Sequence, residues 1–380
     1  MKIVCFADSH VNSAKYGRLD PDTGLNTRAV QSLQLVNEVV DYALEHNADA
    51  LVFAGDAFRN PTPPPTVADR TASAFARAAA QMKVLILDGN HDVPPQENQV
   101  SCLSMFSTLQ VPNVLQTRFA TSWDVKGADG VVVRLATLPT HHTLATIKET
   151  MDHVDTSVPT VIVGHLTVRG AKLNEWTNAE AETDIPLEVL TKKGVAAVVL
   201  GHLHEHQLLN EEPPVFYCGS TNRVDFGEEK QTKGFVVMDV NKAGKVDLQF
   251  VPLDNAQRFV TVDVSTTADD ATPEVIAAVQ QARVYDAVVR VRLTCTSATV
   301  VNERDLLTEA NARGVTHLMK IARTVVDEPD VATSTNALPQ GTTAHDAVVA
   351  YFDGQPRGKE RTKLALSIVN AVDTKTEVTT

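Results

Sequence analysis

The sequence has little of what marks several common classes of protein. Its 380 residues include 4 cysteines, which are far apart and form no C-x-x-C pair, so neither a disulfide scaffold nor a structural zinc site is expected. No stretch approaches the roughly 18 consecutive apolar residues that a membrane helix requires, and the N-terminus lacks a basic region followed by an apolar run. We therefore predict a soluble, unsecreted protein that does not act at a membrane.

Basic side chains are also scarce. The 34 lysines and arginines are outnumbered by 47 aspartates and glutamates, so the formal net charge is 34 minus 47, or −13. Proteins that bind nucleic acids usually neutralise phosphate with lysine and arginine, and the overall charge opposes that here. A polyanionic substrate would therefore need metal ions, a local basic groove or a partner protein.

What is present is enough apolar sequence for a large core, at 43% hydrophobic residues. The length predicts two or three domains of about 100 to 200 residues each. Short apolar runs predict buried strands at 2–7, 50–54, 84–87, 131–138, 160–163 and 196–200, and helical periodicity predicts helices at 27–46 and 65–81. The alternation of strands and helices predicts a layered α/β core.

The composition changes near residues 254–258. Beyond them a strand, helix, strand, helix, strand pattern predicts a small α+β domain, and a stretch rich in Asp, Thr, Pro and Ser then predicts a linker. Two short amphipathic segments follow, at 345–352 and 361–372. We predict a main domain at 1–255, a small domain at 256–326, a linker at 327–343 and a helical tail at 344–380.

Polar residues directly follow the predicted strands of the main domain. They are Asp8 and His10, then Asp56, then Asn90, His91 and Asp92, then His165, and finally His202 and His204. Residues at the carboxyl ends of strands in an open α/β sheet converge on one edge, so these side chains are expected to meet. Of these nine, two aspartates, one asparagine and four histidines can hold two divalent metals, with His91 and one aspartate left over.

The donor types restrict the metal. Mixed nitrogen and oxygen ligands suit manganese, iron or zinc better than magnesium or calcium, which prefer oxygen alone. Two metals roughly 3.5 to 4 Å apart can clamp the attacking and leaving oxygens of a phosphoryl displacement. The pattern therefore predicts phosphoester hydrolysis without a covalent protein nucleophile.

The ordered motifs Asp8-Ser9-His10, Gly55-Asp56, Gly89-Asn90-His91-Asp92, Gly164-His165 and Gly201-His202-Leu203-His204 resemble those of the calcineurin-like metallophosphoesterases. Within that superfamily, the run Gly55-Asp56-Ala57-Phe58, the run from Tyr217 to Glu228 and the trailing small domain resemble the SbcD/Mre nucleases of double-strand-break repair. The likeness covers residues 1 to 255 and is architectural beyond them. It implies a four-layer α/β sandwich, a DNA-binding capping domain and a C-terminal tail that docks a partner.

The resemblance also implies roles for single residues. The first metal would take Asp8, His10 and His204, the second Asn90, His165 and His202, and Asp56 would bridge both. His91 would contact the scissile phosphate or protonate the leaving oxygen, and Asp92 would accept a hydrogen bond from the His91 ring. A positioned imidazole of this kind contributes about 10² to 10⁴-fold.

For the whole protein the resemblance implies a manganese-dependent nuclease of the cytoplasm, from a bacterium or a phage. It would act as an exonuclease on duplex ends and an endonuclease on single strands or hairpins. Because the chain is acidic, an SbcC-type coiled-coil ABC ATPase would supply much of the grip on DNA, bound by the C-terminal tail. The family also often forms homodimers. Magnesium, iron or zinc could replace manganese.

Contacts with substrate are less well marked. Arg59 stands where many relatives carry His or Asp and could contact phosphate, and Arg28 lies in a loop beside the expected site. Ser220 and Arg223 could shape a nucleotide pocket or merely form a tight turn. The tail segments could dock a partner or pack on the chain's own surface, and His206 is expected to have a structural or rim role.

Two other functions remain open. An enzyme of the same fold could act on a small nucleotide or a phosphoprotein, although such an enzyme has no evident need for a capping domain and a tail. Alternatively, the chain could be a docking protein with a vestigial site. The presence of every expected ligand and of His91 favours an active enzyme.

Overall fold

The computed structural model describes residues 1–96, 99–173, 184–326, 343–352, 359 and 361–367. The chain divides into two compact units, residues 1–325 and 326–380. The predicted linker lies outside the described residues except for Thr343. Among the described helices, none combines the length and the apolar character needed to cross a membrane.

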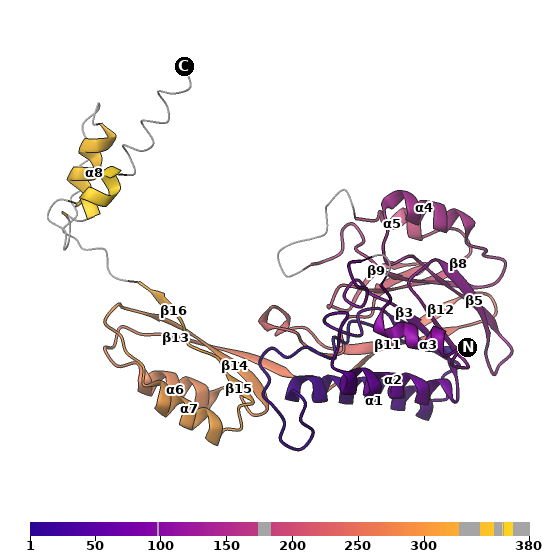
Figure 1. Ribbon diagram of the computed structural model, residues 1–380, viewed down its shortest axis with the longest axis horizontal. Helices are drawn as coiled ribbons and strands as arrows, with labels where there is room; N and C mark the ends of the chain where they lie inside the picture. The colour runs from indigo at the N-terminus through magenta and orange to yellow at the C-terminus, as the bar shows by residue number, and fades with distance from the viewer. Residues whose placement is uncertain (97–98, 174–183, 327–342, 353–358, 360, 368–380) are drawn as a thin grey trace. The chain divides into compact units, whose positions relative to one another are not determined.

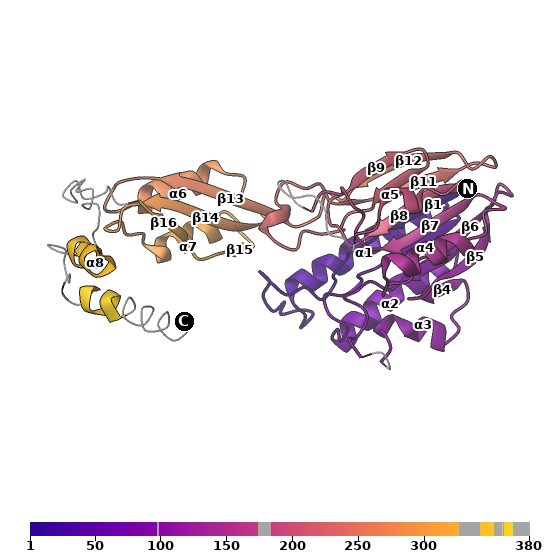
Figure 2. The ribbon, with the colours of Figure 1, turned by 90° about the horizontal axis from the view of Figure 1, so that it is seen from above.

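Two mixed six-stranded sheets form the centre of the first unit (Figure 1). The first sheet has the order β12-β11-β1-β2-β3-β4, in which β1 to β4 are parallel and β11 is antiparallel to β1 (Figure 2). Its strands are β1 (Lys2–Phe6), β2 (Ala50–Ala54), β3 (Lys83–Leu87), β4 (Val114–Thr117), β11 (Gly234–Val240) and β12 (Val246–Pro252).

The second sheet has the order β5-β6-β7-β8-β10-β9. Strands β6, β7, β8 and β10 are parallel, and β5 and β9 run antiparallel at the two edges. Its strands are β5 (Thr121–Lys126), β6 (Val132–Thr137), β7 (Thr160–His165), β8 (Val195–Gly201), β9 (Gln207–Glu211) and β10 (Pro214–Tyr217).

Alternating side chains of these strands build three apolar layers. Val4 and Phe6 of β1 pack in a cluster with the first helices, whereas Ile3 and Cys5 pack in a cluster with residues of the second sheet. Successive side chains of a strand point to opposite faces, and each fully buried apolar side chain contributes about 1.5 to 3 kcal/mol. The confirmed α/β sandwich therefore has four layers.

The helices cover the outer faces of the two sheets. Helices α1 (Thr27–Glu45), α2 (Pro65–Ala79) and α3 (Met105–Thr108) pack on the first sheet, and α4 (Leu144–His153) and α5 (Leu187–Leu190) pack on the second. Helix α1 begins where expected because the Asn26 side chain accepts the main-chain N–H of Arg28 at 2.9 Å. Short 3₁₀ turns lie at Cys102–Ser104 (η1) and Phe226–Glu228 (η2).

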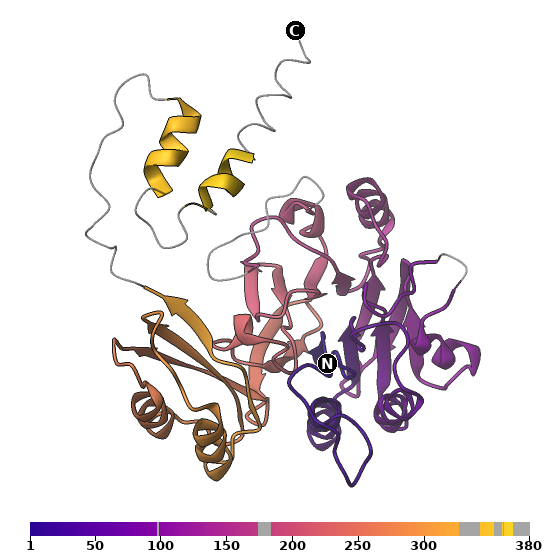
Figure 3. The ribbon, with the colours of Figure 1, turned by 60° about the vertical axis from the view of Figure 1, so that its left-hand side comes forward.

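A third sheet, all parallel, ends the first unit. Strand β14 (Ala287–Cys295) pairs with β13 (Arg258–Ser265), β15 (His317–Leu318) and β16 (Ala322–Val325). Helices α6 (Thr272–Gln281) and α7 (Glu303–Ala312) cover one face of it (Figure 3). Val289, Val291 and Leu293 of β14 pack in the cluster beneath these helices, so the intervening Arg290 and Arg292 lie on the opposite face.

The second unit contains α8 (Ala344–Phe352) and a helical stretch at 361–367. Both coincide with amphipathic segments expected from the sequence, although the last residues of the second segment, 368–372, lie outside the described residues. Each presents an exposed apolar side chain, Val349 at 41% and Leu364 at 66%.

Candidate metal centre

The carboxyl ends of five parallel strands bring the candidate residues together. Asp8, Asp56 and Asn90 follow β1, β2 and β3 of the first sheet, and His165 and His202 lie at the ends of β7 and β8 of the second. The main-chain carbonyl of Ala54, in β2, accepts a hydrogen bond from Nδ1 of His165 at 2.8 Å and so links the two sheets. The site therefore lies where both sheets end.

One group of donors consists of Asp8, His10 and His204. One ligand atom from each lies within 4.8 Å of the others. Nε2 of His10 is 3.1 Å from Nε2 of His204, and both Asp8 oxygens accept the main-chain N–H of His202 at 3.0 Å. Three donors of the types that bind transition metals thus converge on one point.

A second group contains Asn90, His165 and His202. Oδ1 of Asn90 lies 3.0 Å from Nε2 of His165 and 3.1 Å from Nδ1 of His202. The amide oxygen and two imidazole nitrogens form a mixed donor set like that of the first group.

Asp56 lies between the two groups. Its Oδ2 is 3.4 Å from Nε2 of His165 and 3.7 Å from Nε2 of His10. Its Oδ1 accepts the main-chain N–H of His91 at 2.9 Å. One carboxylate therefore contacts a histidine of each group, which is the placement that a shared ligand requires.

Four of the candidate residues have backbone conformations in the left-handed region. Asp8, His10, Asp56 and His202 have φ values of 53°, 41°, 60° and 94°. Each such conformation costs on the order of 1 to 3 kcal/mol in a residue other than glycine and persists where the surroundings enforce it. The surrounding structure therefore holds these strand ends in conformations that bring their side chains to one place.

Two glycines allow the strand ends to approach one another. A Cβ atom at Gly55, whose φ is +98°, would lie 2.3 Å from Nδ1 of His165. A Cβ atom at Gly89 would lie 2.1 Å from Oδ1 of Asp56. Any side chain at either position would displace a candidate ligand.

The outer nitrogen of three rings is held by a partner in the protein. Nδ1 of His165 faces the Ala54 carbonyl at 2.8 Å, Nδ1 of His10 faces the Phe58 carbonyl at 3.3 Å, and Nδ1 of His204 faces Oε1 of Glu228 at 2.7 Å. Because carbonyl and carboxylate oxygens only accept, each Nδ1 carries a proton and Nε2 is the ligand atom.

Burial and charge set the protonation of these groups. Burial lowers the pKa of His10 to about 3 and that of His202 to about 4, so both rings are neutral at pH 7 and can donate a lone pair. Burial also opposes protonation of His165, but the Asp56 carboxylate raises its pKa to about 9.

Burial and neighbouring charges also act in opposite directions on the pKa of Asp56, and here the charges lower it. Burial favours its neutral form, yet His165 and His10 hold its pKa well below the usual range. Asp56 is therefore an anion at pH 7, and a metal that binds to His165 must displace a proton. The donor set, the tautomers and the charges fit two divalent metal ions.

His91 and Asp92 are positioned differently from expectation. Nδ1 of His91 faces the Arg59 carbonyl at 3.0 Å. The buried Asp92 carboxylate instead accepts main-chain N–H groups of Gly89, Phe58 and Ala57 at 2.9, 2.9 and 3.1 Å. The prediction that Asp92 holds the His91 ring is therefore wrong, because three main-chain donors at the ends of β2 and β3 use its oxygens.

Three of the four residues expected to touch substrate are used inside the protein. The Arg28 guanidinium is buried and donates to Gln31 at 2.7 Å and to the Arg223 carbonyl. Ser220 is fully buried and donates to the Asn222 carbonyl at 2.8 Å. Their polar atoms stabilise the fold, and the expectation that they contact substrate is not met.

Arg223 is the third of these residues. Its guanidinium donates to the carbonyls of Glu228, Gln231 and Gln257 at 3.2, 2.6 and 3.0 Å. These contacts hold residues 228–231 and 257 together, which gives Arg223 a structural role. Arg59, in contrast, is exposed beside His91 and remains a candidate for contact with phosphate.

Sequence reasoning gave no role to two residues that adjoin the centre. Glu228 contacts His204, and the fully buried Lys233 contacts Glu228 with Nζ 2.6 Å from Oε2. The available signal is weak: Lys233 directly precedes the apolar run of β11, and buried lysines are almost always paired. His206, as expected, is structural: its Nδ1 faces the Tyr217 carbonyl at 2.8 Å and its ring stacks on Phe250.

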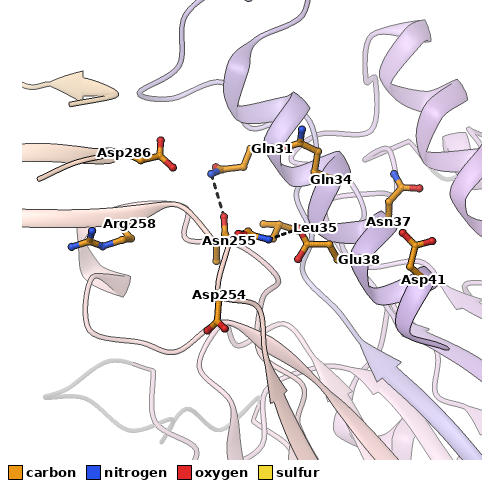
Figure 4. A pocket seen from close by; sticks show the side chains of 11 residues that line it. Gln31, Gln34, Leu35, Asn37, Glu38, Asp41, Asp254, Asn255, Arg258 and Asp286 are labelled. Carbon is orange, nitrogen blue, oxygen red and sulfur yellow. Dashed lines mark hydrogen bonds between the residues drawn. The ribbon is translucent and has the colours of Figure 1, made fainter. Parts of the chain in front are cut away.

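A cavity of about 610 Å³ between α1 and residues 254–258 is a different feature (Figure 4). No candidate ligand lines it. Its charged lining consists of Glu38, Asp41, Asp254, Asp286 and Arg258. Four carboxylates and one guanidinium do not suit a phosphate ester, so the cavity is not a second candidate for the substrate site.

Comparison with known proteins gives the following matches. A family model described as calcineurin-like phosphoesterase matches residues 1–206. A dimetal phosphatase from Danio rerio is 12% identical, with a TM-score of 0.40 over 66% of this chain and 95% of that one. The phosphoesterase Yfce from E. coli is 13% identical, with a TM-score of 0.30 over 63% of this chain and 88% of that one. Nuclease MPE from Pseudomonas putida is 14% identical, with a TM-score of 0.21 over 44% of this chain and 63% of that one.

Proposed function

The chain belongs to the calcineurin-like phosphoesterases, and we propose that within this family it is a DNA nuclease, the SbcD-type subunit of an end-processing complex. The family implies a metal-dependent hydrolase of phosphoesters. We propose that the substrate is a phosphodiester of DNA and that two metals, preferably manganese, bind at the site. Their ligands would be Asp8, His10, Asp56, Asn90, His165, His202 and His204.

Bound at these ligands, the metals would act as Lewis acids toward the phosphate and activate water. The protein's own residues supply charge, orient the ligands and donate a proton. Asp56 supplies negative charge to both groups of ligands, and main-chain bonds fix the rings. Nδ1 of His91 faces the Arg59 carbonyl and carries a proton there, so the ring can protonate the leaving oxygen only from Nε2 of its doubly protonated form.

One observation favours DNA as the substrate: the third sheet is joined to the metal centre through residues 223–231. Phe226 packs on Phe259 of β13 at 4.9 Å between ring centroids, and the Arg290 guanidinium lies 4.3 Å from the Phe226 ring. The Glu229 carboxylate accepts the main-chain N–H of Thr261 at 2.7 Å. A second module fixed beside a phosphoester site suits a long substrate, and we propose that it caps and binds DNA.

The charge of −13 favours a second candidate, a phosphodiesterase or phosphatase acting on a small nucleotide or a phosphoprotein, because such substrates need no basic surface.

End-labelled linear duplex and single-stranded DNA, and a chromogenic phosphodiester, should therefore be incubated with the purified chain in manganese, magnesium or chelator. We expect DNA cleavage that requires metal and is lost in Asp56→Asn. Hydrolysis of the chromogenic ester alone would favour the small substrate, and no hydrolysis at all would favour the vestigial site.

We further propose that the tail binds a coiled-coil ABC ATPase, through apolar side chains such as Val349 and Leu364. Deleting residues 344–380 should leave metal binding and single-strand cleavage unchanged and abolish co-purification with the ATPase. Unchanged affinity of the truncated chain for the ATPase would contradict the proposal. We also propose that the chain forms a homodimer. Light scattering during gel filtration of the full chain and of the chain without residues 344–380 tests this.

A further inference from the structure

His204 is held by a network of charged side chains that has no counterpart at the other two rings. Nδ1 of His204 lies 2.7 Å from Oε1 of Glu228, whose side chain is 11% exposed. His10 and His165 each use a neutral main-chain carbonyl at the same ring position. A carboxylate partner fixes the ring and raises the basicity of the nitrogen that binds the metal.

Lys233 in turn holds Glu228. Its Nζ lies 2.6 Å from Oε2 of Glu228, donates to Oγ of Ser220 at 2.8 Å and to the carbonyl of His204 at 3.1 Å, and is fully buried. Oε2 of Glu228 also accepts the main-chain N–H of Val224 at 3.1 Å. Both charges therefore have several partners, as charges in a protein interior must.

The turn that carries Glu228 is fixed by contacts of its own. Arg223 donates to the carbonyls of Glu228, Gln231 and Gln257, and the Asp225 side chain accepts the main-chain N–H of Gly227 at 2.8 Å. Glu229, the next residue, bonds to Thr261 of the third sheet. The position of the Glu228 carboxylate is thus set by the fold rather than by His204 alone.

We propose that Glu228, held by Lys233, is a positioning residue that orients His204 and strengthens metal binding by the Asp8, His10 and His204 group. The inference rests on the two-metal site of the proposed function and not on the identity of the substrate. Glu228 touches neither metal nor substrate; it acts through the His204 ring.

The test measures binding of Mn²⁺ alone by calorimetry, at one fixed pH, in wild type, Glu228→Gln and Glu229→Gln. Glutamine keeps the size of the side chain and removes the charge, and Glu229 is the matched control because its carboxylate bonds to Thr261 instead. In Glu228→Gln we expect one of two Mn²⁺ ions to bind about 10- to 100-fold more weakly, with the other unchanged. Hydrolysis of a chromogenic phosphodiester should recover at saturating Mn²⁺, which a general loss of structure would not allow.

A second measurement covers the possibility that Glu228→Gln destabilises the whole protein. In a His204→Ala background, adding Glu228→Gln should make no further difference to Mn²⁺ affinity, since the group that it orients is absent. Wild-type affinity in Glu228→Gln, or an equal loss with and without His204, would overturn the inference alone. A wild-type protein that binds no Mn²⁺ would overturn the proposed function as well.

Discussion

The two groups of ligands in the metal centre differ in how one histidine of each, His165 or His204, is held. In the Asn90, His165 and His202 group, the outer nitrogen of His165 faces the Ala54 carbonyl of β2, a strand of the other sheet. In the Asp8, His10 and His204 group, the outer nitrogen of His204 faces a carboxylate from a turn 24 residues further along the chain. The first arrangement follows from the packing of the two sheets against each other, whereas the second depends on the identity of single side chains.

This difference separates what the fold guarantees from what the sequence must supply. Any chain that packs the sheet containing β2 against the sheet containing β7 in this way provides the Ala54 carbonyl. Only a chain with an acidic residue at 228 and a cation at 233 provides the second kind of support. Substitutions outside the ligands should therefore affect the His204 group more than the His165 group.

The largest effect is expected where the two groups share a ligand. Asp56→Asn keeps the size of the side chain but removes the anion that contacts both His10 and His165. We expect it to bind neither metal tightly and to lose about 10⁴-fold or more of phosphodiester hydrolysis, since each metal supplies several kcal/mol of transition-state stabilisation. Metal analysis of the purified variant and its circular dichroism provide the measurement and the control. Two retained metals with normal turnover would show that Asp56 is not shared.

A smaller loss is expected at a residue that belongs to neither group. His91→Ala retains the main-chain N–H that donates to Asp56, so both metals should stay bound. Turnover should fall by about 10² to 10⁴-fold because the general acid is gone. Single-turnover cleavage at saturating manganese measures the chemical step. A loss of less than tenfold would remove His91 from the proposed mechanism.

The smallest effect concerns stability on the Asn90 side. Burial raises the pKa of Asp88, at the end of β3, to about 6, although Gln116 donates a hydrogen bond to it at 2.8 Å. Because the folded-state pKa exceeds the unfolded value of 3.8, Asp88 favours the folded state at low pH and that contribution is lost as the pH rises through about 6. The loss reaches about 3 kcal/mol.

Asp88→Asn should abolish this contribution. In metal-free protein, the free energy of unfolding of the variant should increase relative to that of wild type as the pH rises from 4 to 7. Urea denaturation across this range, in the presence of chelator, measures the difference between the two proteins. Parallel pH profiles for variant and wild type would rule out the ionisation of Asp88 as the cause.

Much of the fold and of the candidate site could be predicted because both depend on local patterns. Buried strands are apolar runs, and the polar residues that end them are adjacent in sequence, so Asp8, Asp56 and Asn90 could be placed at one sheet edge without knowledge of the register. The edge strand β5 was missed for the opposite reason. Its residues Ser122 and Asp124 are exposed, and it carries no apolar run.

Long-range contacts of polar side chains could not be predicted in the same way. Arg28 follows a helix cap and carries no sequence sign that its guanidinium donates to the carbonyl of Arg223, 195 residues away. Glu228 lies in a turn without periodicity, and its contact with His204 exists only after β8, β10 and η2 have folded together. The same limit explains the misplaced role of Asp92, whose main-chain partners come from two different strand ends.

The pairing of β1 with β11 has a consequence for the protein during its synthesis. Asp8 and His10 leave the ribosome first, but the strand before them lies between β2 and β11, and β11 begins at Gly234. The last ligand, His204, and its support at Glu228 also come late. All the proposed ligands are therefore made before Glu228 and before β11, the strand that flanks β1. We expect the metal centre to form only after β11 has been synthesised and has paired with β1.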